Sequence, residues 1–118
     1  MIYIIEDDEI MAECIAMACR KVKQPVQIFH DAVSAMQALS SQLPELIFLD
    51  ILLTGPDGFT FLNEMVSYED TVKIPIIIVS SLDFKNQDLS HYGVKRVLNK
   101  ATMTPDDIKN CLKEFVHG

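Results

Sequence analysis

A chain of 118 residues has the size of one ordinary domain, and its 49% hydrophobic content can fill a core without disulfides or a structural metal. Its 17 acidic residues outnumber its 10 basic ones, and the net charge of −7 argues against direct nucleic-acid binding by this segment. Cys14, Cys19 and Cys111 form no C-x-x-C pair, and no targeting segment or membrane-length apolar stretch is visible. We therefore expect a single cytoplasmic domain over residues 1–118, with no contact to a membrane.

Short apolar runs alternate with helical patterns along the chain. The runs are rich in Ile, Val, Leu or Phe and predict buried parallel strands at 2–5, 26–29, 46–49, 76–79 and 94–98. Apolar residues at helical spacing predict a helix after each strand. These residues are Met11, Cys14, Ile15, Ala18, Cys19 and Val22; Ala32, Ala35, Met36 and Leu39; Phe59, Leu62 and Val66; and Ile108, Cys111, Leu112, Phe115 and Val116. The fourth helix, predicted over 84–92, is short and mostly polar.

Helix-ending and helix-starting residues agree with this division. Pro25, Pro44 and Pro75 each stand just before a predicted strand, where they end the preceding helix. Thr104 and Pro105 suit the N-cap and the first position of the last helix. Five βα units in succession predict an α/β fold, with a five-stranded parallel sheet covered by helices on both faces.

Polar residues stand where the predicted strands end. The carboxyl ends of parallel strands meet at one edge of the sheet, and the loops there build the functional site. The residues expected at that edge are Glu6-Asp7-Asp8, Asp50, Ser80-Ser81 and Asn99-Lys100. An acidic run after a strand often only begins the next helix, which is the commoner explanation of residues 6–8 taken alone. Asp50 and Lys100 at neighbouring strand ends favour a functional cluster instead.

The chemistry of this cluster follows from its charges. Converging carboxylates repel one another unless a cation lies among them, and an oxygen-only ligand set suits Mg²⁺, with Mn²⁺ as an alternative, better than zinc or copper. A carboxylate held beside such an ion, here Asp50, can accept a phosphoryl group. This transfer needs mainly positioning and charge neutralisation, for which Lys100 and Ser80 are placed. Taken singly, a lysine at a strand end is usually just solvated, and a serine there is usually a turn residue.

Together these residues resemble the receiver domains of two-component response regulators, and the resemblance covers the whole chain. The motifs that carry it are Glu6-Asp7 after Tyr3-Ile4-Ile5, Asp50 within Phe48-Leu49-Asp50-Ile51-Leu52-Leu53, Asp57-Gly58, Pro75-Ile-Ile-Ile-Val-Ser80-Ser81 and Leu98-Asn99-Lys100. Asp57 lies seven residues after Asp50 (57 − 50 = 7) and Ser80 lies thirty after it (80 − 50 = 30), as in the family. No single motif is specific, but the five in this order and spacing are.

The resemblance implies a CheY-like, flavodoxin-like three-layer sandwich with strand order 2-1-3-4-5. It also implies a switch that accepts a phosphoryl group on Asp50 from a histidine kinase or phosphotransfer protein, rather than a turnover enzyme. Asp7, Asp50 and the backbone carbonyl of Leu52 would bind Mg²⁺ directly, and Glu6 would bind it through a water molecule. Asp8 falls beyond the acidic pair and is expected to open the first helix.

The same resemblance implies a relay from the acceptor to a partner. Lys100 would pair with Asp50 before transfer and with the phosphoryl group afterwards. Ser80, followed by Ser81, would sense that group and pull its loop inward. The output protein, or a second copy in a homodimer, would bind the face formed by residues 84–92, the fifth strand and the last helix.

Three departures from the family pattern affect this relay. Thr54 stands where the family often has proline, with Pro56 two places later, and Ala101 stands where proline usually follows the lysine. Val97 replaces the Tyr or Phe that rotates inward on activation, and it cannot make that motion.

Other functions stay open at this point. A phosphate-independent, receiver-like interaction module is favoured mildly by those departures. A haloacid-dehalogenase-like phosphatase would need a second Asp at the position of Leu52 and room for a substrate cap. No G-x-x-x-x-G-K-[ST] motif is present, which excludes a P-loop NTPase. The chain could also be the N-terminal receiver of a longer regulator, for example one that binds DNA through another domain.

Overall fold

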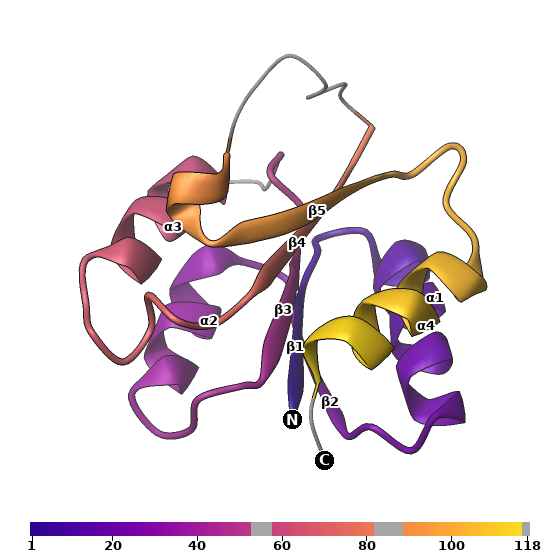
Figure 1. The fold of residues 1–118 in the computed structure, drawn as a ribbon, viewed down its shortest axis with the longest axis horizontal. Helices are drawn as coiled ribbons and strands as arrows, with labels where there is room; N and C mark the ends of the chain where they lie inside the picture. Colours follow the sequence, from indigo (N-terminus) through magenta and orange to yellow (C-terminus); the bar gives the residue numbers. More distant parts are fainter. Residues whose placement is uncertain (53–57, 82–88, 117–118) are drawn as a thin grey trace.

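The computed structural model describes residues 1–52, 58–81 and 89–116. The elements are, in chain order, β1 (Ile2–Ile5), α1 (Glu9–Lys21), β2 (Val26–Phe29), α2 (Ala32–Leu39), β3 (Leu46–Leu49), α3 (Gly58–Val66), β4 (Ile76–Ser80), the 3₁₀ helix η1 (Ser90–Tyr92), β5 (Val94–Asn99) and α4 (Pro105–Phe115). The five strands form one parallel sheet in the order β2-β1-β3-β4-β5. Helices α1 and α4 cover one face of this sheet, and α2 and α3 cover the other (Figure 1). The predicted fold class and strand order are confirmed.

The central strands are buried on both faces, as their uninterrupted apolar sequences predict. Because side chains alternate along a strand, each strand serves two cores. Ile4 and Phe48 pack toward α1 and α4, whereas Ile5 and Leu49 pack toward α2 and α3. All four side chains are essentially inaccessible to solvent. This double burial holds the strand ends, and so the residues that follow them, in fixed relative positions.

The buried face of α1 differs from the predicted stripe. Its fully buried residues are Ala12, Ile15, Ala16, Ala18 and Cys19. Cys14 is exposed and Val22 is 39% exposed, so both lie outside the core. The prediction followed the larger side chains, but small alanines let the helix lie close to the sheet and therefore occupy the inner face.

The other two cysteines behave as predicted, as small apolar side chains in the core. Both are buried, on α1 and on α4. Burial raises the pKa of Cys19 to about 12 and that of Cys111 to about 11, so these thiols stay protonated at neutral pH.

The first and last helices begin at the capping residues that the sequence predicts. Asp8 is the N-cap of α1, where its Oδ1 accepts hydrogen bonds from the backbone N–H of Ile10 (2.9 Å) and Met11 (3.1 Å). Thr104 caps α4, and Pro105 occupies its first turn. The prediction that Asp8 opens the first helix is thus confirmed.

The region before β5 is only partly described. Of the helix predicted over 84–92, residues 84–88 lie outside the described residues, and residues 90–92 form a single 3₁₀ turn that ends at Gly93 with φ 82°. Strands β4 and β5 each run one residue beyond the prediction, because Ser80 and Asn99 still pair in the sheet. Within the parts of the chain that the structure describes, no helix has the length and apolarity needed to cross a membrane.

Candidate functional site

Side chains alternate between the two faces of the sheet, and this alternation places three charged residues just beyond the strand ends on the same face. Each lies two residues after a side chain of the core beneath α1 and α4: Glu6 after Ile4, Asp50 after Phe48 and Lys100 after Leu98. Backbone hydrogen bonds extend the sheet to these positions, from the N–H of Glu6 to the carbonyl of Phe29 (2.9 Å) and from the N–H of Asp50 to that of Ile5 (2.9 Å). The sheet itself therefore brings the three side chains together.

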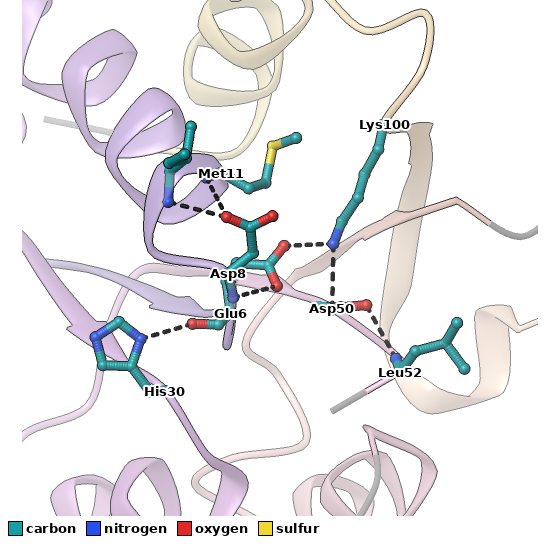
Figure 2. A network of polar contacts seen from close by, with 8 residues as sticks. Glu6, Asp8, Met11, His30, Asp50, Leu52 and Lys100 are labelled. Atoms are coloured by element: carbon teal, nitrogen blue, oxygen red, sulfur yellow. Dashed lines mark hydrogen bonds and ion pairs between the residues drawn. The ribbon is translucent and has the colours of Figure 1, made fainter. Parts of the chain in front are cut away.

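Lys100 connects the two buried carboxylates. Its Nζ lies 2.6 Å from Glu6 Oε1 and 3.2 Å from Asp50 Oδ2 (Figure 2). The side chains of Glu6 and Asp50 are 1% and 5% exposed, and that of Lys100 is 21% exposed. In the described part of the chain, Glu6 Oε1 has this ion pair and no hydrogen-bond partner besides. A buried carboxylate pair of this kind is held together by its ammonium partner.

Burial and the closeness of the charged groups shift the pKa values of Glu6 and Lys100. Burial raises the pKa of Glu6 to about 7; the hydrogen bond with Lys100 opposes this rise, and the nearby Asp50 adds to it. Burial alone would lower the pKa of Lys100, but its contacts with Glu6 and Asp50 raise it above its ordinary value. Lys100 is accordingly a permanent cation between two acids.

The chemistry of the donor set fits a divalent cation. Glu6, Asp7 and Asp50 each offer a carboxylate oxygen, and these oxygens lie within 4.8 Å of one another. Three carboxylates and one ammonium leave two negative charges when all are ionised (3 − 1 = 2), which a hard divalent ion such as Mg²⁺ would neutralise. Asp7 is exposed, so an ion held by these residues would stay open to solvent.

The two buried carboxylates have further partners in the backbone. Asp50 Oδ1 accepts a hydrogen bond from the N–H of Leu52 (2.9 Å), and Glu6 Oε2 accepts one from the N–H of Asp8 (3.3 Å) (Figure 2). His30 Nδ1 lies 2.9 Å from the carbonyl oxygen of Glu6. His30 thus contacts the backbone in the loop that follows β2. The Leu52 N–H contact was not predicted, since the family resemblance implied a role only for the carbonyl of that residue.

The remaining predicted site residues lie on β4 and β5. Ser80 is completely buried at the end of β4, and its carbonyl accepts the N–H of Lys100 (3.0 Å). Its neighbour Ser81 is exposed. Val97, at the position of the expected aromatic switch, is 41% exposed on β5. The Lys100–Ala101 peptide bond is trans.

The sequence did not reveal why residue 58 must be a glycine. A Cβ atom built on it would lie 2.6 Å from Ile51 Cα and 2.9 Å from the Ile51 carbonyl oxygen. The N–H of Gly58 donates to that same oxygen (3.1 Å). The first turn of α3 therefore packs directly on the residue that follows Asp50. The other motif residues of this loop, Thr54, Pro56 and Asp57, lie outside the described residues.

Comparison with known proteins identifies the family of this chain. The family model for the response regulator receiver domain matches residues 2–113. Transcription factor SKN7 of Saccharomyces cerevisiae is 28% identical over 98% of this chain, which covers 18% of that protein. The DNA-binding dual master transcriptional regulator RpaA of Synechocystis is 34% identical over 69% of this chain, and the match covers 34% of it. The chain thus spans about a third or less of these relatives.

Solved structures give the same result for the fold. The receiver domain of sensor histidine kinase PA1611 from Pseudomonas aeruginosa, with a magnesium ion coordinated in its active site cleft, superposes with a TM-score of 0.83 at 21% identity; the alignment covers 97% of this chain and 94% of that one. The family match over nearly the whole chain agrees with the strand order and with the acidic cluster at the carboxyl edge. This chain belongs to the response regulator receiver domain family of two-component signalling systems.

Proposed function

We propose that this chain is a phosphorylation switch, a single receiver domain over residues 1–118 in which Asp50 accepts a phosphoryl group in an Mg²⁺-dependent reaction. The observation that carries the proposal is the buried Asp50 carboxylate, held 3.2 Å from Lys100 Nζ and gathered with Glu6 and Asp7 within 4.8 Å. A magnesium ion in the corresponding cleft of the PA1611 receiver supports it.

The donor atoms suggest how each residue would take part in ion binding. Asp7 and Asp50 would bind Mg²⁺ directly, together with the carbonyl of Leu52. Glu6 would bind it through water, because its two oxygens already contact Lys100 and the Asp8 N–H. When bound, the ion would neutralise charge on the phosphoryl oxygens.

The transfer itself is a displacement at phosphorus. An Asp50 carboxylate oxygen forms a bond to phosphorus while the bond between phosphorus and a donor histidine nitrogen breaks, and the nitrogen keeps the electron pair. Lys100 then moves its hydrogen bond from Asp50 to a phosphoryl oxygen, as a charge-assisted contact. Ser80, buried beside Lys100 at the neighbouring strand end, would donate its hydroxyl to another oxygen.

The donor is a phosphohistidine protein, a histidine kinase or a phosphotransfer protein. The exposed face of α1, the helix that begins beside the site, offers a surface for it: Ile10 is 78% exposed, Met17 is 53% exposed, and Cys14 between them is also exposed. These residues share one helix face at i, i+4 and i+7, and exposed apolar side chains so grouped mark a protein-binding surface. Because all three cysteines are free, we place this exchange in the cytoplasm.

The output partner is either a domain of the same polypeptide or another chain. The chain spans only 18% and 34% of the SKN7 and RpaA proteins. An output domain in the same polypeptide is therefore one candidate partner, and a separate protein or a second copy is the other. We propose that residues 84–92, β5 and α4 form the contacting face.

The first prediction concerns the acceptor. Incubated with an acyl phosphate donor and Mg²⁺, the wild type should gain one phosphoryl group by intact-protein mass spectrometry, and hydroxylamine should remove it. Asp50→Asn should gain none, because an amide cannot form the aspartyl phosphate. Asp106→Asn, an exposed aspartate in the first turn of α4, is the matched control and should be labelled like the wild type. A wild type that gains no group would indicate the phosphate-independent interaction module instead.

A further inference from the structure

A pocket of about 320 Å³ lies between the last turns of α2 and α3 and the turn that leads to β4. Met36 and Leu39 contribute from α2, and Phe61 and Met65 from α3. Phe61 and Met65 are fully buried, and the two α2 residues are half-buried. The floor is therefore apolar, and its volume is at the lower end of the range of small-molecule sites.

This pocket is separate from the Asp50 site. Leu39 is the last residue of α2, and Met65 stands next to the end of α3. In a parallel βα fold, helices end near the amino edge of the sheet, whereas Asp50 and Lys100 stand at the carboxyl edge. Nothing in the phosphorylation chemistry uses these side chains.

The rim of the pocket is acidic and aromatic. Glu64 and Asp70 are exposed lining residues, and Tyr68 between them in sequence is 58% exposed. None of the residues that line this pocket, all within the described ranges, is basic. Two carboxylates in a lining that contains no basic residue favour a cation, and an aromatic face adds to that preference through the cation–π interaction. An anion would meet repulsion here.

We propose that this pocket binds a small organic ammonium ion with an apolar body. The apolar part would lie on Met36, Leu39, Phe61 and Met65, and the ammonium group would lie at the rim between the carboxylates and the Tyr68 ring. The occupant is defined by charge complementarity and size. A neutral apolar molecule would gain nothing from the two carboxylates, and a large one would exceed the volume.

Titration of ¹⁵N-labelled protein with phenethylammonium tests this assignment by chemical-shift changes. We expect saturable shifts confined to residues 36–40 and 61–71, in titrations up to about 20 mM, which covers the weak affinity of so small a ligand. Phenylacetate has the same ring and similar size but the opposite charge, and should cause no saturable shifts there. Shifts from both compounds alike would mean a non-specific apolar site and would overturn the proposal.

Charge variants separate the rim from the general acidity of the protein. Glu64→Gln and Asp70→Asn should each weaken phenethylammonium binding about twofold to fivefold, as expected for exposed ion pairs. Glu69→Gln removes an equal charge from a neighbouring residue that does not line the pocket, and should leave the affinity unchanged. Equal losses in all three variants, or an absence of saturable shifts in the wild type, would contradict the site. The folded state of each variant is checked in the same spectra.

Discussion

The acidic residues of the carboxyl edge have unequal surroundings. Glu6 is buried, and its two oxygens contact Lys100 and the Asp8 N–H, whereas Asp7 faces solvent. Asp50 is buried and contacts Lys100 and the Leu52 N–H. An ion that enters from solvent therefore meets Asp7 first. Adjacent acids in the sequence are thus expected to contribute differently to ion affinity.

Two substitutions test this difference. Glu6→Gln should weaken Mg²⁺ binding by about tenfold, the lower end of the loss seen when an outer-sphere partner is removed. Asp7→Ala should weaken it more, because it removes a direct carboxylate ligand. Isothermal titration of both variants measures the order. Glu45→Gln, just before β3 at the amino edge of the sheet, serves as a control that removes an acid at the opposite edge from the cluster and should leave the affinity unchanged. Equal losses for Glu6 and Asp7 would contradict the assignment of direct and indirect ligands.

At Gly58 the backbone leaves no room for a side chain. The added Cβ of Gly58→Ala would lie 2.6 Å from Ile51 Cα, so α3 or the residue after Asp50 must shift. Overpacking of this kind costs about 1–3 kcal/mol of unfolding free energy, which urea denaturation would measure. Because Ile51 follows Asp50 directly, we also expect weaker Mg²⁺ binding.

Gly93→Ala is the matched control for this variant. Gly93 has φ 82°, so alanine there is strained by about 1–2 kcal/mol, but its Cβ would lie 3.4 Å from the nearest atom and far from Asp50 in the chain. Both variants should lose stability, and only Gly58→Ala should lose ion affinity. If the two lose ion affinity equally, Gly58 does not position the site.

At the scale of elements, α4 depends on a complete capping box. Thr104 Oγ1 accepts the N–H of Asp107 (3.3 Å), and Asp107 Oδ2 accepts the N–H of Thr104 (2.8 Å). Thr104→Ala should therefore lower the unfolding free energy by about 1 kcal/mol. Thr102→Ala removes the same groups from an exposed turn residue and should change it by less than about 0.5 kcal/mol. Thermal or urea unfolding distinguishes the two; equal effects would exclude the cap as the cause.

The elements themselves were largely predictable, because parallel strands and capped helices depend on local patterns. The runs at 2–5, 26–29 and 46–49 coincide with β1, β2 and β3. The orientation of α1 was not predictable from hydrophobicity alone. Cys14 and the alanines have similar apolar character, and only the close approach of helix and sheet selects Ala12 and Ala16 for the inner face.

The residues of the site were predictable for the same reason. Strand ends in a parallel sheet converge, so Glu6, Asp50 and Lys100 could be grouped before their contacts were known. What the sequence could not show were contacts that involve the backbone, because these depend on the path of the loops. The Leu52 N–H on Asp50 and the close contact of Gly58 with Ile51 are of this kind.

At the scale of the whole molecule, β4 and β5 connect the candidate site to the proposed output face. Ser80 pairs with Asn99 in the sheet, and its carbonyl accepts the N–H of Lys100. A change at the phosphoryl group can therefore reach β5 through the backbone. Val97 is 41% exposed and carries no ring that could turn inward. The relay in this chain is accordingly expected to use Ser80 and the loop that follows it.

The last prediction tests that relay by hydrogen exchange. On phosphorylation, protection of backbone amides should change across residues 81–92, a segment that is mostly polar in sequence, because Ser80 directly precedes it. Ser80→Ala should abolish this change while Asp50 still gains its phosphoryl group, because the hydroxyl that senses the group is absent. Val97→Ala is the control on the neighbouring strand and should keep both labelling and the change in protection. A change lost in Val97→Ala but kept in Ser80→Ala would place the relay on β5, and no change in the phosphorylated wild type would show that this segment does not respond to phosphate.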